Sequence, residues 1–262
     1  NQTIAKSDDF GKFDSGLKND KLLLIDAEKA KEIKGESENS NWEISKIESK
    51  PTSSSAAPPF TTSTLQQDAS RRFGYSPKRT MVVAQKLYEQ GFITYMRTDS
   101  TTLSKEALAA SKKFILDKFG EDFLPENSNF YKSKVANAQE AHEAVRPAGT
   151  TFKEPAHVLK SLGKDEAKLY ELILNRTLAS QMKPAQYIRT NIEIVNGKSI
   201  YRASGNITTF KGYTAAYEQA LSRTQKSVIA ALPPIQKDSK IIHNNIDAVS
   251  YTHLRAHETR IH

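Results

Sequence analysis

Three amphipathic segments follow one another between residues 63 and 119, and each carries signals for the start and end of a helix. In the first segment, Ser63 and Gln66 predict a capping box, and Gly74 marks the expected end. The pattern therefore begins with a short, well-delimited helix.

The second segment has Ser76 at the expected cap and Pro77 at the first helical position, and it ends before Gly91. Its expected buried stripe consists of Met81, Ala84 and Tyr88.

The third segment is expected to begin after Ser104 and to run to Phe119, where a glycine follows. Leu103 and Leu108 are spaced as a hydrophobic staple. The run of residues 91–100 is therefore expected to be held between two capped helices.

Strand-like patterns precede these helices. Residues 22–25 form a short apolar run, and residues 42–48 alternate apolar and polar positions. Between them, a helix is expected from Asp26 to Lys34, with Gly35 as its stop. The composition of residues 51–59, rich in Pro and Ser, predicts a linker.

The residue pattern of the C-terminal half predicts both helices and strands. In chain order, the expected elements are a helix at 138–146 ended by Pro147, a helix at 165–182, hairpin strands at 187–194 and 199–204 around Asn196-Gly197, and an extended stretch at 207–217. The whole pattern predicts an α+β fold in which a mainly helical domain is flanked by small β segments.

Composition narrows the classes of function. The chain has 262 residues, a formal net charge of +8 and a pI near 9.4. Its basic balance favours a polyanionic partner, with nucleic acid the first candidate. The absence of cysteine excludes disulfides and thiolate metal sites. No apolar run approaches the roughly 18 residues of a membrane span, and no signal peptide is visible, so a cytoplasmic protein without membrane contact is expected.

Candidate chemistry concentrates in residues 91–100, where Tyr95, Arg97 and Asp99 occupy alternate positions. Side chains two apart in an extended segment lie on one face. A phenol is a poor nucleophile while protonated, and a nearby guanidinium favours the phenolate and can also hold a phosphate with two hydrogen bonds. The same alternation, which includes Ile93, also suits an ordinary half-buried strand. Spacing alone leaves both interpretations open.

Six short motifs follow one another along the chain. They are Ala57 to Gln67, Lys78 to Met81, Ala84 to Glu89, Gly91 to Ser100, Gln139 to Pro147 and Leu178 to Ala185. Together they resemble bacterial DNA topoisomerase I, of the type IA family, over roughly residues 20–235. Met96, between Tyr95 and Arg97, favours this branch over the topoisomerase III branch, which usually has proline there.

The resemblance implies a role for each residue of the triplet. Tyr95 matches the family nucleophile, which attacks a DNA phosphodiester and stays linked to the 5′ phosphate. Arg97 matches the arginine that holds the scissile phosphate, a role that suits a planar cation. Asp99 matches a family acid that positions Arg97 or moves a proton. The implied reaction is cleavage of one strand without ATP, strand passage and religation, which relaxes negative supercoils.

Five further residues are candidates for DNA contact. His142 matches a family histidine that binds a backbone phosphate, although by position alone it is a helix-surface histidine. Gln85 and Glu89 match positions close to the site, with packing and helix solubility as the alternative. Lys78 and Arg79 lie near a helix start, where a basic pair is otherwise simply solvated.

The resemblance also implies a division of the chain as part of the family's torus. The expected parts are residues 1–52 as the first β segment of an arch or hinge domain, 53–185 as the helical domain that carries Tyr95, 186–218 as the returning β segment, 219–248 as the start of a following domain, and 249–262 as a sequencing-adapter artefact. The last part departs abruptly from the family. Its His253 and His257, although four apart, are therefore not interpreted as a metal site.

The family binds Mg²⁺ through an Asp-x-Asp-x-Glu cluster in a Toprim domain, and this sequence contains no such cluster. Mg²⁺ is therefore expected in the full-length enzyme and not on this chain. The chain is expected to be an internal fragment that is inactive alone. Its expected partner is single-stranded or underwound DNA, and a monomer is expected.

Two other classes of function compete with this one. A basic helical domain can hold single-stranded DNA without chemistry, but such platforms interleave aromatic and basic residues, and here the aromatic residues fall mostly on apolar faces. A tyrosine recombinase or relaxase needs a cluster of arginines and histidines before the tyrosine, or a three-histidine metal site. Neither pattern is present.

Overall fold

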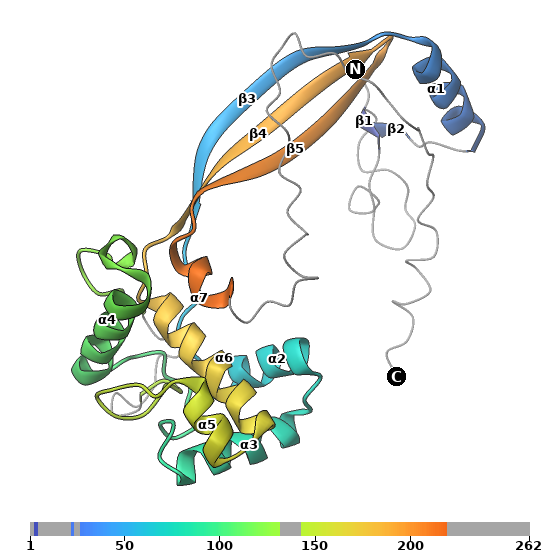
Figure 1. Ribbon diagram of the computed structural model, residues 1–262. Coiled ribbons are helices and arrows are strands. Elements are labelled where there is room, and N and C mark those ends of the chain that lie inside the picture. Colours follow the sequence, from blue (N-terminus) through green and yellow to red (C-terminus); the bar gives the residue numbers. More distant parts are fainter. Residues whose placement is uncertain (1–2, 5–21, 24–26, 132–142, 219–262) are drawn as a thin grey trace. The chain divides into compact units, whose positions relative to one another are not determined.

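The computed structural model describes residues 3–4, 22–23, 27–131 and 143–218. The elements in chain order are β1 (Thr3–Ile4), β2 (Leu22–Leu23), α1 (Ala27–Asn39), β3 (Trp42–Ser54), α2 (Thr62–Phe73), α3 (Pro77–Glu89), α4 (Lys105–Phe119), η3 (Glu121–Phe123), α5 (Pro155–Ser161), α6 (Lys164–Ser180), β4 (Ala185–Asn196), β5 (Ser199–Phe210), η4 (Gly212–Thr214) and α7 (Ala215–Glu218), as Figure 1 shows. The predicted α+β class is confirmed.

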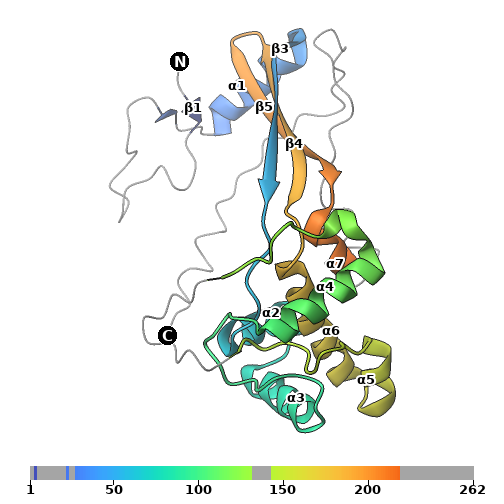
Figure 2. The ribbon, with the colours of Figure 1, turned by 90° about the vertical axis from the view of Figure 1, so that its left-hand side faces the viewer.

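Two compact units divide the chain. The first comprises residues 1–49, 190–205 and 232–262, and the second comprises 50–189 and 206–231. A three-stranded sheet has the order β3-β4-β5, and Figure 2 shows its strands running alongside one another. β1 pairs with β2 in parallel in a separate two-stranded sheet.

In the first unit, α1 is anchored beside the turn between β4 and β5. The Ser37 hydroxyl is 2.5 Å from the Tyr201 hydroxyl, and the amide of buried Asn196 donates to the carbonyl oxygens of Ser37 and Ser40. The predicted helix stop at Gly35 is wrong, because α1 continues to Asn39. A glycine within a helix costs only about 1 kcal/mol relative to alanine, which these contacts can offset.

The predicted linker at residues 51–59 is wrong in its first part, since β3 continues through Pro51 to Ser54. β3 is an edge strand of its sheet, and an edge strand tolerates a residue that cannot donate to the ladder. The predicted hairpin is confirmed, with the turn shifted by one residue so that Asn196 ends β4 and Gly197, at φ 55°, enters the turn.

The second unit is built around α6, which contacts α2, α3, α4, α5 and α7. Figure 1 shows α6 in the midst of these helices. Its buried residues lie nearly all round the helix, as expected for a helix enclosed by others. Their largest members are Leu169, Tyr170, Leu172, Ile173, Leu174 and Leu178.

Local signals predicted several helix ends correctly. The hydroxyls of Ser76 and Ser104 accept from the backbone N–H groups of Arg79 and Ala107 at the starts of α3 and α4. Gly74 ends α2 in the left-handed conformation, at φ 67°.

Three other predictions in this unit are corrected. The capping box of α2 consists of Thr61 and Thr64, not Ser63 and Gln66. In α3 the buried face is Thr80, Val83, Ala84 and Leu87, whereas Met81 is half-buried and Tyr88 is exposed. The stretch predicted as extended at 207–217 leaves the sheet after Phe210 and continues as η4 and α7.

Candidate active site around Tyr95

The segment that carries Tyr95 is an irregular loop between α3 and α4 and not a strand; its one ladder contact is an isolated bridge between Ile93 and Pro147. Exposed and buried side chains nevertheless alternate along this loop, as they would in a strand. Tyr95, Arg97 and Asp99 are exposed, while Met96 between them is buried. The loop therefore presents the phenol, the cation and the acid to solvent.

Thr62, the first residue of α2, holds the loop on the C-terminal side of Tyr95. Its hydroxyl donates to the Met96 carbonyl oxygen at 2.7 Å and accepts from the Thr98 N–H at 2.8 Å, and its own N–H donates to the Thr98 carbonyl oxygen at 2.9 Å. These bonds fix the backbone on both sides of Arg97.

Thr94 holds the loop on the N-terminal side of Tyr95. Its hydroxyl donates to the Ala144 carbonyl oxygen at 2.8 Å and accepts from the Arg146 N–H at 3.0 Å. The Thr94 N–H donates to the Arg146 carbonyl oxygen, and the Ala148 N–H donates to the Phe92 carbonyl oxygen, both at 2.9 Å. Tyr95 thus lies between two hydrogen-bonded clamps.

Replacing Thr62 with valine is expected to lower the free energy of unfolding by about 1–3 kcal/mol, because the near-isosteric change leaves the Met96 carbonyl and the Thr98 N–H without their partner. Urea unfolding monitored by circular dichroism measures the change. Thr151→Val, at an exposed position of the same unit, is the matched control. Equal stability of the two variants would refute the clamp.

The segment that pairs with the loop is extended. A helix was predicted over 138–146, but in its described part, from Glu143 onward, Val145 bridges Phe60. The Val145 N–H donates to the Phe60 carbonyl oxygen at 2.8 Å, and the Ala144 N–H donates to the Thr102 carbonyl oxygen at 2.9 Å. Pairing with distant backbone replaces the helix in these residues.

An ion pair between buried Arg146 and half-buried Glu143 organises this extended segment. Arg146, only 6% exposed, donates to Glu143 Oε2 through Nη2 at 2.7 Å and Nε at 3.2 Å, and through Nη1 to the Pro147 carbonyl oxygen at 2.8 Å. Glu143 Oε1 accepts from the Ser104 N–H at 2.6 Å. The pair thereby joins the clamp on Thr94 to the start of α4.

Burial raises the pKa of the Glu143 carboxyl, but hydrogen bonds from Ser104 and Arg146 and the charge of Arg146 outweigh it and hold the net pKa below its usual value of 4.5. Because the folded-state pKa is lowered, the charged form stabilises the fold above pH 4.5, and this contribution is lost as the pH falls through the folded-state pKa.

The difference in unfolding free energy between the native chain and Glu143→Gln should therefore be constant above about pH 5 and shrink below it. Urea unfolding at a series of pH values measures this difference. A difference that stays constant to about pH 3 would contradict the assignment.

The side chains of the triplet do not bond to one another. Tyr95, 44% exposed, packs edge-on against Tyr88 of α3, with ring centroids 5.2 Å apart. Arg97 and Asp99 form no ion pair with each other. The expected role of Asp99 in positioning Arg97 therefore has no direct contact in support of it here.

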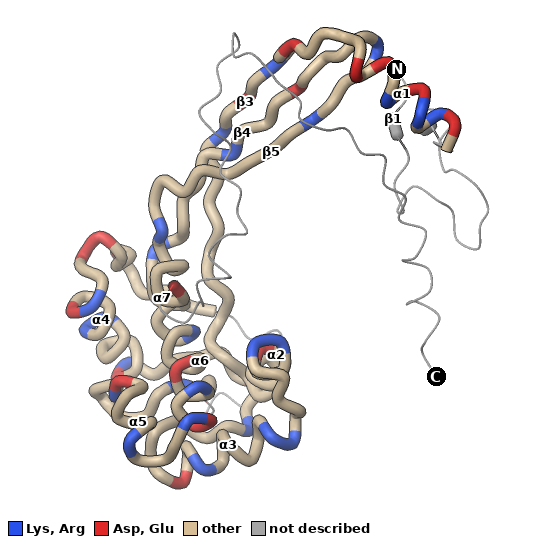
Figure 3. Tube along the Cα trace, turned by 45° about the vertical axis from the view of Figure 1, so that its right-hand side comes forward, with Lys and Arg blue, Asp and Glu red and all other residues tan. Residues whose placement is uncertain are grey.

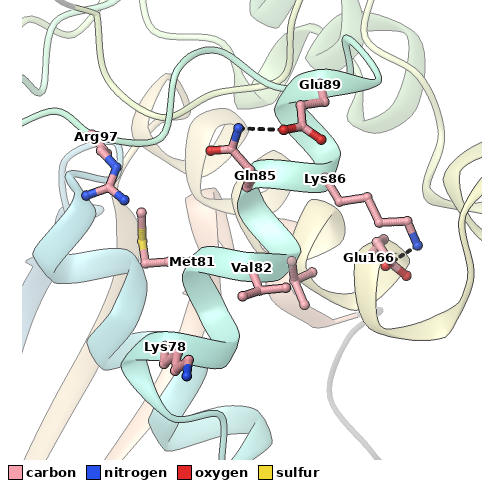
Figure 4. Close-up of a pocket in the computed structure, with 9 residues that line it drawn as sticks. Lys78, Met81, Val82, Gln85, Lys86, Glu89, Arg97 and Glu166 are labelled. Carbon is pink, nitrogen blue, oxygen red and sulfur yellow. Dashed lines mark hydrogen bonds and ion pairs between the residues drawn. The ribbon is translucent and has the colours of Figure 1, made fainter.

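Arg97 lines a groove along α3 with a volume of about 660 Å³. Gln85 and Glu89 also line it and are joined by a hydrogen bond of 2.7 Å, as Figure 4 shows. Lys78 lies in the same groove. The structure thus brings four residues singled out in the sequence to one surface.

Two other candidates lie elsewhere. Arg79 forms an ion pair with Asp165 at 2.5 Å and stacks over the ring of Tyr75, so its guanidinium already has partners within the unit. Burial, with the neighbouring Asp165 carboxylate, raises the pKa of Tyr75 to about 12. His142 lies outside the described residues.

Sequence reasoning missed the residues that hold the loop, Thr62, Thr94 and Arg146. All three lie inside the matched motifs, but nothing in their local spacing indicates which backbone groups they bind. Within the described residues, no cluster of three or more His, Cys, Asp or Glu side chains has the geometry to hold a metal ion. None of the described helices has the length and apolar character needed to cross a membrane.

Comparison with known proteins assigns the family. A family model described as DNA topoisomerase matches residues 3–259. The chain is 47% identical to DNA topoisomerase 1 of Campylobacter jejuni over 206 residues, which cover 76% of this chain and 29% of that protein. It is 45% identical to the Streptomyces coelicolor protein of the same name over 219 residues, covering 82% and 23%.

Among solved structures, full-length topoisomerase I from Thermotoga maritima superimposes with a TM-score of 0.65 at 34% identity, covering 81% of this chain and 34% of that one. The chain therefore belongs to the bacterial type IA DNA topoisomerase family, and the resemblance seen in its motifs is confirmed. It spans less than a third of the length of each of these two curated relatives.

Proposed function

We propose that this chain carries the nucleophilic part of a type IA topoisomerase site, which cuts one DNA strand through a 5′-phosphotyrosine and then reseals it. The observation that supports this proposal most strongly is the loop of residues 91–100. It presents Tyr95 and Arg97 at the surface of a backbone that is clamped on both sides.

In the cleavage step, the Tyr95 hydroxyl gives up its proton to solvent and its oxygen attacks the phosphorus of a phosphodiester. A bond forms between Tyr95 and the phosphorus, the bond to the 3′ oxygen breaks, and the strand leaves with a 3′ hydroxyl once that oxygen gains a proton. Attack of this hydroxyl on the phosphotyrosine reverses the step. One phosphoester replaces another, so no ATP is consumed.

Arg97 is the group proposed to hold the phosphate during both steps. Its planar guanidinium can donate two hydrogen bonds to phosphate oxygens and offset the charge that develops there. The clamp formed by Thr62 on Met96 and Thr98 keeps the backbone of Arg97 in place, and such preorganisation favours the transition state.

Magnesium, which the family implies, does not fit the described residues. Asp99 is one exposed carboxylate, and the described parts of the chain bring no set of ligands together around it. No step is therefore assigned to a metal on this chain. Single-stranded or underwound DNA remains the proposed substrate, and a monomer the proposed state.

The alternative, a DNA-binding module without chemistry, makes a different prediction for trapped complexes. The full-length gene product is incubated with a single-stranded oligonucleotide labelled at either its 5′ or its 3′ end, then denatured and separated by electrophoresis. The proposal expects only the 3′ label to stay on the protein, on a tryptic peptide that contains Tyr95. Binding without any covalent product would favour the alternative.

A further inference from the structure

The groove beside Arg97 follows one face of α3. Lys78, Val82, Gln85 and Glu89 recur at spacings of four, three and four residues, so they share a face of the helix. From the first to the last of them, the helix rises by about 16 Å. Val82 is 63% exposed and gives the groove an apolar wall.

The two acidic side chains of the groove already have partners, so two of its basic side chains can bind a ligand. Glu166 is paired with Lys86 at 2.7 Å, and Glu89 accepts a hydrogen bond from Gln85. In the described parts of the chain, neither Lys78 nor Arg97 takes part in an ion pair. In Figure 4, Met81 lies between these two cations.

A lysine at position 78 does not stabilise the helix in which it lies. α3 has no acidic residue in its first turn and begins Pro77-Lys78-Arg79, and Figure 3 shows basic positions at the start of this helix. The helix dipole disfavours cations there. Arg79 is compensated by Asp165 at 2.5 Å, whereas Lys78 has no such compensation among the described residues. An anionic ligand would supply it.

We infer that this groove binds the DNA segment directly 3′ of the phosphate that Tyr95 attacks. Arg97 holds the first phosphate, Lys78 holds a later phosphate, and bases rest on Met81 and Val82. The inference rests on the proposed function, because a 5′-phosphotyrosine leaves this segment attached to Tyr95. The attached segment stays bonded to Tyr95, and the groove lies in the same unit as Tyr95.

Binding of short oligonucleotides to the 262-residue chain tests the inference directly. The probes are oligothymidylates of two to eight nucleotides that carry a phosphate at the 5′ or the 3′ end and a fluorophore at the other end, and fluorescence anisotropy gives Kd. The 5′-phosphorylated probes mimic the attached segment and should bind more tightly than the 3′-phosphorylated probes of equal length.

Lys78→Glu should raise Kd for the 5′-phosphorylated probes by about fivefold or more and reduce the slope of log K against log salt by about 0.7, the effect of losing one phosphate contact on a single strand. Lys112→Glu, an equal charge reversal at an exposed position of α4, should leave the slope unchanged. Val82→Asp should weaken binding without a change in fold by circular dichroism.

Equal effects of the two lysine reversals, or no preference for the 5′ phosphate, would overturn the groove assignment. Trapped adducts at Tyr95 in the full-length product test the proposed function separately. If adducts form and Lys78→Glu has no specific effect, the function stands and the groove assignment fails. If no adducts form, the function fails whatever the groove binds.

Discussion

Replacing Tyr95 with phenylalanine is expected to reduce the covalent DNA adduct of the full-length gene product to below about one thousandth of the native amount, because in the proposed mechanism the Tyr95 hydroxyl supplies the attacking oxygen. The ring and its edge contact with Tyr88, at 5.2 Å between centroids, remain in the variant. Binding of single-stranded DNA should therefore change little, and the loss should fall on the chemical step.

Tyr88→Phe is the matched control for this experiment. Tyr88 is also an exposed phenol, 41% exposed against 44% for Tyr95, and it lies beside it. The proposal expects this variant to form adducts at close to the native amount. Adducts that persist in Tyr95→Phe and vanish in Tyr88→Phe would show that Tyr88, and not Tyr95, is the nucleophile.

Replacing Arg146 with methionine is expected to destabilise the second unit by about 3 kcal/mol, because Arg146 is buried and its removal leaves the half-buried Glu143 carboxylate without its counter-charge. Here Glu143 would keep the hydrogen bond from the Ser104 N–H, at 2.6 Å, but lose its counter-charge. Urea unfolding of the 262-residue chain, followed by circular dichroism, measures the loss.

Lys211→Met provides the comparison, because it removes the exposed Lys211–Glu218 pair, 2.8 Å apart, in the same unit. An exposed pair of this kind contributes less than about 1 kcal/mol. A loss in Arg146→Met no larger than in Lys211→Met would show that the Glu143–Arg146 pair does not hold the segment. Adduct formation should fall in Arg146→Met, because a segment that has lost its ion pair holds the backbone bonds of residue 146 to Thr94 less firmly.

The elements that could be predicted are those with signals close by in the chain. The hydroxyls of Ser76 and Ser104 each cap a helix three residues away, and Gly74 ends a helix through its own backbone conformation. The corrected capping box of α2 is also a local signal, because Thr61 and Thr64 are three residues apart. The corrected end of α1 has a tertiary cause, since the helix continues past Gly35 where Ser37 contacts the sheet.

The extended segment from Glu143 to Pro147 shows the same limit. Its composition suits a helix, but Val145 pairs with the backbone of Phe60, and Ala144 and Arg146 bond to Thr94. Backbone hydrogen bonds to partners far away in the sequence produce no periodic pattern of residue types. The periodicity of a helix, by contrast, is visible in any amphipathic run. The prediction therefore favoured the local pattern over the true one.

For this chain, the order of residues alone was enough to identify the family and to single out Tyr95, Arg97 and Asp99, because both depend on residue types at short, fixed spacings. Folding in three dimensions set how those residues are held. The loop is clamped by Thr62, 34 residues from Met96, and by Ala144, 50 residues from Thr94. The groove likewise exists only because Arg97 returns to the face of α3.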